Sequence, residues 1–142
     1  MPETESEGRA LLNIQSEAMR TKDIDRLMSL YSPDVIYFDV VPPLQYAGAA
    51  ALRSRFLEWF DGWKGSFGME VRDLNILASE DIAVAHWLSR ASGTLTSGQK
   101  AGSWVRATSC CQWSNQRWLI THEHISWPVD LNSRSAVMDL VP

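Results

Sequence analysis

Residues 100–128 have the sequence KAGSWVRATSCCQWSNQRWLITHEHISWP, and their pattern gives the strongest indication of the fold. Mostly small and apolar side chains alternate with polar and larger ones along much of this stretch, and this period of two is typical of β-strands. The polar residues 114–116 interrupt the alternation, so we expect strands over 100–113 and 117–128, joined by a three-residue hairpin loop. Strands joined by such a short loop pair antiparallel.

The same period continues upstream and predicts two more strands, over 66–77 and 82–95, separated by short polar turns. Before residue 66, apolar residues recur every three or four positions instead, which indicates amphipathic helices. We expect these elements there, in order: a helix over 4–20, a short helix after Lys22, a strand over 35–41 and a helix over 47–63.

Helices followed by a four-strand meander are typical of an α+β fold. Long strands twist, so the antiparallel sheet should curve strongly into a cone around the N-terminal helices. Helices rarely fill such a cone, and we therefore expect an internal pocket. The chain of 142 residues has the length of one domain, and we expect residues 1–142 to form a single unit.

Composition excludes several classes of function. The net charge of −4 and the scattered basic residues argue against a nucleic-acid partner. No apolar stretch has the length of a membrane span, so we expect no membrane association. The adjacent Cys110 and Cys111 would point to opposite faces of a strand, which indicates reduced thiols and a cytoplasmic location.

The last hairpin separates into two faces with different chemistry. We expect the mostly apolar face to line the pocket; it consists of Val105, Ala107, Ser109, Cys111, Thr121, Glu123 and Ile125. The polar face should meet solvent or a partner subunit; it consists of Trp104, Arg106, Thr108, Cys110, His122, His124 and Ser126. A shift of one residue in the hairpin would mix the two faces.

Three histidines raise the question of a metal site. His122 and His124 lie two apart on one strand face, and His86 could supply a third ligand. The alternative is a polar network of His86, Arg106, His122 and His124 across a dimer interface. We expect the network, no metal, and a homodimer formed through this sheet face.

Asp39 is a carboxylate inside an otherwise apolar strand. Burial among aromatic side chains would disfavour its charged form and make it a proton shuttle. The alternative is a strand-end carboxylate that caps the turn at Pro42 and Pro43. Glu123 is the other candidate, and its alternative is an ion pair with Arg53 or Arg55.

The segment 118–128 (WLITHEHISWP), which follows Arg106, Ala107 and Thr108, resembles the last hairpin of nuclear transport factor 2-like proteins. The closest similarity is to the SnoaL-like and ketosteroid isomerase-like group. The segments KDID (22–25), YSPD (31–34) and PPL (42–44) and the helix start at Gly48 are also similar to that group. The resemblance spans the chain and implies the cone-shaped fold, which hosts isomerases, cyclases, hydrolases, dehydratases and non-catalytic proteins.

The resemblance also implies roles for single residues. Asp39 matches the general-base aspartate of the isomerases, and Trp87 matches an aromatic pocket position. Their oxyanion-hole tyrosine falls near Gln15, and their second aspartate falls at Thr108 or Ser109, so both oxyanion donors are changed. Glu123 matches a catalytic aspartate of epoxide hydrolases with this fold.

Together these features predict a cofactor-independent acid/base enzyme of the isomerase, cyclase, dehydratase or hydratase type, acting on a small apolar molecule. Asp39 and Glu123 would be its catalytic residues. The substrate-binding residues would be Gln15, Tyr37, Trp59, Trp87, Ser109 and Thr121. The alternative function is a non-catalytic module for ligand binding or dimeric assembly.

Overall fold

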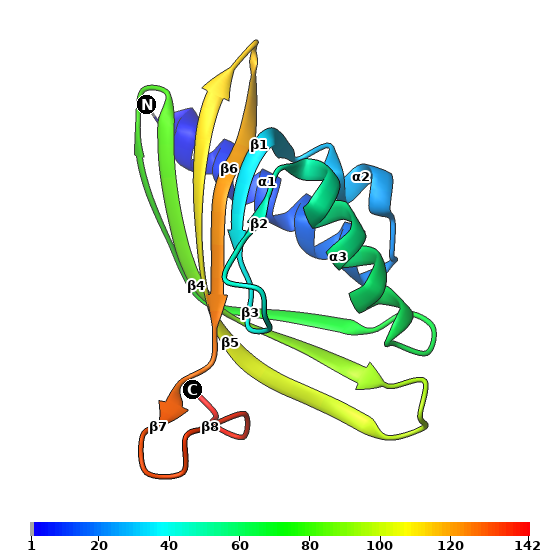
Figure 1. Ribbon diagram of the computed structural model, residues 1–142. Coiled ribbons are helices and arrows are strands. Elements are labelled where there is room, and N and C mark those ends of the chain that lie inside the picture. Colours follow the sequence, from blue (N-terminus) through cyan, green and yellow to red (C-terminus); the bar gives the residue numbers. More distant parts are fainter. Residues whose placement is uncertain (1) are drawn as a thin grey trace.

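The computed structural model describes residues 2–142, and Figure 1 shows how their helices and strands are arranged. The N-terminal half of this range contains α1 (Pro2–Arg20), α2 (Ile24–Met28), β1 (Tyr31–Phe38), β2 (Tyr46–Ala47) and α3 (Ala49–Asp61). The second half contains β3 (Gly68–Ser79), β4 (Ile82–Thr94), β5 (Lys100–Ser114), β6 (Arg117–Ser126), β7 (Val129–Asp130) and β8 (Ser135–Ala136). The expected elements are present, with ends shifted by a few residues.

Strands β1 to β6 form one sheet in the order β2-β1-β6-β5-β4-β3. The neighbours from β3 to β6 pair antiparallel, as the short turns between them require. β1 joins the sheet parallel to β6, with Tyr37 beside Glu123, because the four intervening strands and α3 allow the long crossover. The expected α+β fold is confirmed, with one parallel pair in the sheet.

The sheet curves around the helices. Figure 1 shows that β3, β4 and β5 bend along their length, so that their lower parts pass beneath α3. A register shift between Arg72 and Asn75 in β3 breaks the ladder near this bend. On β4, a Cβ at Gly93 would lie 3.0 Å from the Cβ of Phe67, so glycine allows this close approach.

The helices pack their apolar faces into the concave side of the sheet. α1 buries Leu11, Leu12, Ala18 and Met19, and it also buries the polar Gln15 that interrupts this stripe. α3 contributes buried side chains at four-residue spacing: Leu52, Phe56 and Phe60. Each fully buried apolar side chain of this size stabilises the fold by roughly 1.5–3 kcal/mol.

The last hairpin differs from the expected one in its register. Asn115 and Gln116 have φ angles of 54° and 65°, which form a two-residue turn with Ser114 opposite Arg117. The expected three-residue loop is therefore wrong. A register shift between Cys110 and Cys111 adds one residue to β6 in the pairing of the two strands. Beyond this shift Ser109 lies opposite Glu123, and the two residues share one face of the sheet, as expected.

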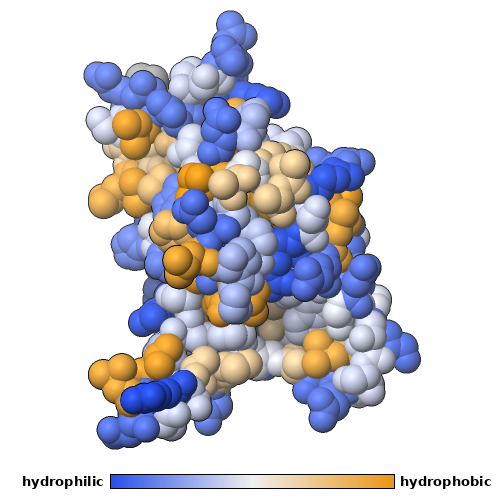
Figure 2. Space-filling view, viewed as in Figure 1, coloured by the Kyte–Doolittle hydropathy of each residue, from blue (hydrophilic) through white to orange (hydrophobic). Residues whose placement is uncertain are grey.

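After β6, the chain forms a small hairpin in which β7 pairs with β8. No strand was expected here, because two-residue strands leave no period in the sequence. Figure 2 shows apolar side chains gathered at the lower left, where Figure 1 places this hairpin. Val129 and Leu131 are 58% and 87% exposed. None of the helices in residues 2–142 combines the length and the apolar character of a membrane span.

Candidate functional site

A cavity of about 500 Å³ lies between the helices and the concave face of the sheet. Its lining comes from α1, α3, the end of β1, the four long strands and the C-terminal segment. The residues that matter for chemistry or shape are Gln15, Met19, Tyr37, Asp39, Arg55, Trp59, Trp63, Trp87, Ser103, Glu123, Ile125, Trp127 and Met138. The expected internal pocket is thus present and has the volume of a small-molecule site.

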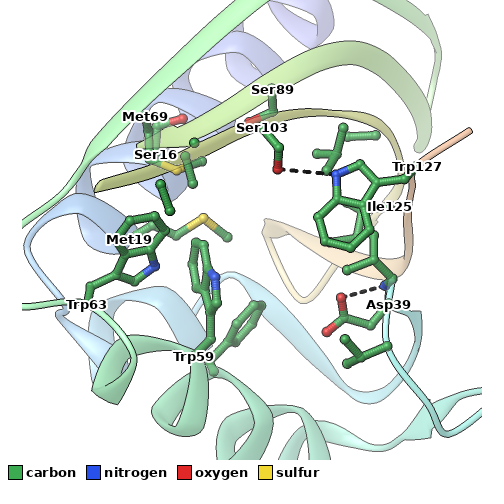
Figure 3. A pocket seen from close by; sticks show the side chains of 18 of the residues that line it. Ser16, Met19, Asp39, Trp59, Trp63, Met69, Ser89, Ser103, Ile125 and Trp127 are labelled. Carbon is green, nitrogen blue, oxygen red and sulfur yellow. Dashed lines mark hydrogen bonds between the residues drawn. The ribbon is translucent and has the colours of Figure 1, made fainter. Parts of the chain in front are cut away.

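Two aromatic walls face each other across the cavity. Figure 3 shows Trp59, Trp63 and Met19 on one side and Trp127 with Ile125 on the other. Trp63 stacks on Phe67 with ring centroids 5.0 Å apart, which fixes the first wall. The indole Nε1 of Trp127 donates to the Ser103 hydroxyl at 3.2 Å, which fixes the second. A flat, mostly apolar molecule would complement these walls.

Glu123 is the most deeply buried carboxylate of the cavity wall, with 2% of its surface exposed. The Tyr31 hydroxyl donates to its Oε1 at 2.6 Å, and Gln15 Nε2 donates to its Oε2 at 2.9 Å. The Ser109 hydroxyl donates to the same Oε2. These donors come from α1, β1 and β5, so the carboxylate of Glu123 holds three elements together.

The electrostatics of Glu123 follow from its burial. Desolvation raises the pKa of Glu123 from its ordinary value, and the hydrogen bonds from Ser109, Tyr31 and Gln15 lower it by less. The neighbouring phenols respond in turn: burial and the Glu123 charge raise the pKa values of Tyr31 and Tyr37 well above the ordinary value. Tyr31 and Tyr37 therefore keep their hydroxyl protons, and Tyr31 donates its proton to Glu123.

Asp39 lies at the cavity wall just beyond the end of β1, as Figure 3 shows. Its Oδ2 accepts from Arg55 Nε at 2.7 Å, and its Oδ1 accepts from the backbone N–H of Val40 at 2.6 Å. The side chains of Asp39 and Arg55 are only 6% and 12% exposed. The expected apolar surroundings of Asp39 are therefore wrong, because α3 places a guanidinium against the carboxylate.

The two carboxylates belong to neighbouring strands and to the same wall. Tyr37 pairs with Glu123, and Asp39 follows Tyr37 by two residues, which returns its side chain to the same face. Glu123 does not pair with either arginine that we considered: Arg53 binds the exposed Asp25, and Arg55 binds Asp39. The cavity wall thus carries one ion-paired carboxylate and one that is held by neutral donors.

The other expected pocket residues fall into three groups. Gln15, Tyr37, Trp59 and Trp87 line the cavity. Ser109 is fully buried and lies behind the lining, where it donates to Glu123. Thr121 lies outside the lining, since it sits at the register shift and its hydroxyl donates to the Cys110 carbonyl at 3.2 Å. Thr121 is therefore the member of the expected set that the structure places away from the cavity.

Sequence reasoning missed Tyr31 and Trp127 as site residues, and it considered Arg55 only as a partner of Glu123 and not of Asp39. Tyr31 lies before the expected strand over 35–41. It is an even number of residues from Val35 and Tyr37, so all three share the buried face of β1. Arg55 precedes Trp59 by four residues, a spacing that puts both on one face of a helix. Trp127 continues the alternation of Glu123 and Ile125 along β6.

The polar residues of the last strands lie on the convex face of the sheet. His86, Arg106 and His124 are exposed, and His122 Nδ1 is 2.7 Å from the Ile36 carbonyl. Phe38 contacts both His122 and His124, with ring centroids 4.8 and 5.3 Å away. Arg106 Nε donates to the Ser126 hydroxyl. Residues 2–142 contain no group of three His, Cys, Asp or Glu side chains placed to hold a metal ion.

Comparisons with solved structures agree with this architecture. The chain is similar to a nuclear transport factor 2-like protein of unknown function from Pseudomonas putida KT2440, with a TM-score of 0.92 and 30% identity over 100% of this chain and 99% of that one. A ketosteroid isomerase-like protein from Erwinia carotovora atroseptica has a TM-score of 0.71 and 17% identity, covering 83% and 91% of the two chains.

A nuclear transport factor 2-like superfamily protein from Salmonella enterica has a TM-score of 0.80 at 16% identity, with 92% of this chain and 94% of that one covered. At such low identity, the Erwinia and Salmonella likenesses show the fold alone. No curated protein matches the chain in sequence. Residues 9–130 match the SnoaL-like domain. The chain therefore belongs to the SnoaL-like domain family of the nuclear transport factor 2-like superfamily.

Proposed function

We propose that this protein is a cofactor-independent acid/base enzyme that acts on a small, mostly apolar molecule in the cavity. The observation that carries the proposal is the pair of carboxylates, Asp39 and Glu123, on one wall of an aromatic cavity of about 500 Å³. Cavities of this kind bind small molecules, and positioned carboxylates transfer protons within them. The reaction would be an isomerisation, cyclisation, dehydration or hydration.

Asp39 is the proton acceptor in this proposal. Each of its oxygens accepts one hydrogen bond, from Arg55 or from Val40, and an ionised carboxylate oxygen can accept a second. Glu123 already accepts from three side chains, so it has less capacity to take a proton from a ligand. Glu123 would serve as the second carboxylate, and Gln15, Tyr37, Trp59 and Trp87 would bind the substrate.

The test measures proton transfer directly and does not require the natural substrate. Small cyclic ketones and enones are incubated with the protein in deuterated water, and NMR follows hydrogen exchange next to the carbonyl. We expect catalysed exchange with some of these compounds, lowered about a thousandfold by Asp39→Asn. Asp25→Asn, which changes an exposed ion pair, should leave it unchanged. Full exchange by Asp39→Asn would overturn the role of Asp39.

One observation favours a second function, a non-catalytic ligand-binding module. Glu123 accepts hydrogen bonds from Tyr31, Gln15 and Ser109, which is the arrangement of a structural carboxylate. In that case the compounds would bind in the cavity without any exchange of their hydrogens. Binding in the absence of exchange for every compound would favour this second function.

We also propose that the convex face of the sheet forms a homodimer. Apolar and aromatic side chains, among them Leu88, Trp104 and Phe38, lie there between exposed polar groups such as Arg106 and His124. Mixed surfaces of this kind are common at interfaces between subunits. Both cysteines are free thiols, which supports a reducing compartment, and we propose the cytoplasm.

A further inference from the structure

Arg55 has hydrogen-bonding capacity that the protein itself does not use. Its Nε donates to Asp39, and its Nη1 lies 3.8 Å from a carboxylate oxygen of Glu58, which is 80% exposed. Among residues 5–142, neither terminal nitrogen of Arg55 donates to a side-chain or backbone acceptor within hydrogen-bond distance. A guanidinium carries five N–H donors, so most of those on Arg55 remain for a ligand.

The position of Arg55 makes those donors relevant to the cavity. Arg55 lines the cavity from α3, one helical turn before Trp59. The other lining cation, Lys100, is an exposed residue at the start of β5. Within the described residues, Arg55 is thus the one largely buried cation that touches both the cavity and a candidate catalytic carboxylate.

Other donors near the carboxylates are already engaged. Gln15 and Ser109 both donate to Glu123. They are therefore unable to bind a ligand oxygen without leaving Glu123 unsatisfied. The Tyr31 hydroxyl also donates to Glu123, and Trp127 donates to Ser103. Among the described residues, the donors that remain for a ligand oxygen that gains negative charge next to Asp39 are the unused nitrogens of Arg55 and the neutral Tyr37 hydroxyl, and only Arg55 carries a positive charge.

We propose that Arg55 is a catalytic residue whose terminal nitrogens bind the carbonyl oxygen of the substrate and stabilise the oxyanion that forms there. The inference rests on the proposed acid/base function and identifies the substrate class as a neutral carbonyl compound with a hydrogen next to the carbonyl group. Asp39 accepts from Nε and thereby also orients the guanidinium.

The proton transfer balances within this group of residues. Asp39 takes the proton from the carbon next to the carbonyl, and an O–H bond forms as the C–H bond breaks. The electron pair moves into the carbonyl group, so the negative charge passes from Asp39 to the substrate oxygen. Arg55 contacts the Asp39 carboxylate through Nε and the substrate oxygen through its terminal nitrogens, and this one cation therefore balances the negative charge before and after the step. Asp39 then returns the proton to the substrate.

The groups around Arg55 are compatible with this role. Asp39, Tyr46 and Glu58 all favour its charged form, and together they outweigh burial, so the pKa of Arg55 is raised. Tyr37 is the remaining titratable group nearby, and burial together with the adjacent carboxylates keeps its hydroxyl protonated. The Tyr37 hydroxyl could therefore donate to the same oxygen as a neutral second donor. Arg55 therefore stays a cation at neutral pH.

The test uses 4-nitrophenol, whose absorbance separates its neutral and anionic forms, as a mimic of the oxyanion. Asp39→Asn has the shape of the protonated acid and reproduces the charge after proton transfer. We expect Asp39→Asn to bind the anion on the order of tenfold to hundredfold more tightly than Asp39→Asn/Arg55→Gln at the same pH. The second variant removes both members of the Asp39–Arg55 ion pair, so neither of these two charges is left without its partner and folding should be preserved.

The matched control is Asp39→Asn/Arg53→Gln. Arg53 lies two residues earlier on α3, is 44% exposed and pairs with Asp25 on the surface. We expect this control to bind the anion as tightly as Asp39→Asn alone. Equal affinity of the Arg55→Gln and Arg53→Gln variants for the anion, with native circular dichroism spectra, would overturn the proposal.

Hydrogen exchange in deuterated water provides a second readout that separates this inference from the proposed function. Arg55→Gln in the otherwise unchanged protein should lower kcat by roughly a hundredfold with little change in KM, and Arg55→Lys should restore part of it. If the unchanged protein catalyses no exchange but binds the anion through Arg55, the proposed enzymatic function is refuted and the oxyanion site is retained. If the protein catalyses exchange and Arg55→Gln does not slow it, the enzymatic function is retained and the catalytic role of Arg55 is refuted.

Discussion

The two faces of β5 and β6 are built from alternate residues of the same strands, yet their environments differ completely. On the concave face, Ser109 and Glu123 are buried and bonded to each other. On the convex face, the next residues along, Thr108 and His124, are exposed and lie opposite each other. In this hairpin, adjacent residues therefore have opposite environments, whereas residues two apart on one strand share a face of the sheet and a similar environment.

The difference also shows what each face can do. The concave face isolates a few polar groups among aromatic rings, where the low dielectric strengthens each hydrogen bond and makes an unpaired group costly. The convex face carries more polar groups, but water can satisfy them there. Chemistry that depends on a shifted pKa or on a desolvated charge is therefore expected on the concave face, and contact with a partner on the convex face.

The largest expected effect compares adjacent residues of β6. Glu123→Ala leaves the donors Tyr31, Gln15 and Ser109 without their acceptor and should lower the free energy of unfolding by about 3 kcal/mol. His124→Ala, on the exposed face, should change it by less than about 0.5 kcal/mol. Urea unfolding measures both values. Similar losses for the two variants would mean that the concave network contributes little to stability.

An intermediate effect is expected from the proposed homodimer. Light scattering at micromolar concentration should give twice the chain mass of 16.0 kDa. Leu88→Glu places a charge on the convex face and should halve that mass, because an unpaired charge in an interface is costly. Leu57→Glu, on the outer side of α3, is the matched control and should leave the mass unchanged. A 16.0 kDa particle for the unchanged protein would contradict the dimer.

The smallest expected effect is a pH dependence that arises from Glu123. Its folded-state pKa is raised above the ordinary value of 4.5 by burial, although three hydrogen bonds offset part of this. The native state therefore keeps the proton to a higher pH than the unfolded chain does. Its contribution to stability is complete below about pH 4.5 and is lost as the pH rises through the folded pKa.

Glu123→Gln cannot titrate at this position, so it isolates the effect. The free energy of unfolding of the unchanged protein, relative to Glu123→Gln, should fall between about pH 4 and pH 8. Urea unfolding of both proteins at about pH 4 and about pH 8 measures this difference in the free energy of unfolding. Glu58→Gln, which changes an exposed carboxylate, should show no such trend. A constant difference between the protein and Glu123→Gln would contradict the raised pKa.

The fold was predictable from the sequence because its strands are long. β4 and β5 have 13 and 15 residues, and buried residues alternate with more exposed ones over 82–90 and over 106–112, a pattern typical of strands. The two-residue turn and the register shift beside Thr121 were not predictable, since a single extra residue changes the pairing without changing the composition. That shift is why Thr121 lies away from the cavity, whereas Glu123 and Ile125 line it.

The site was predictable only in part, for a related reason. Alternation along a strand indicated that Asp39 and Glu123 face inward, but it contains no information about contacts between distant elements. Arg55 of α3 meets Asp39 only because the helix crosses the end of β1, and Gln15 reaches Glu123 across 108 positions of sequence. The partner of each carboxylate therefore required the tertiary structure.

The aromatic walls of the cavity have a consequence for spectroscopy. Of the seven tryptophans in the chain, Trp59, Trp63, Trp87 and Trp127 line the cavity. A molecule that enters the cavity displaces water from around these indoles and so alters the wavelength and intensity of their fluorescence. Much of the intrinsic emission of the protein should therefore report on the occupancy of the cavity. Collections of small molecules can be screened in this way, without a label and before any reaction is known.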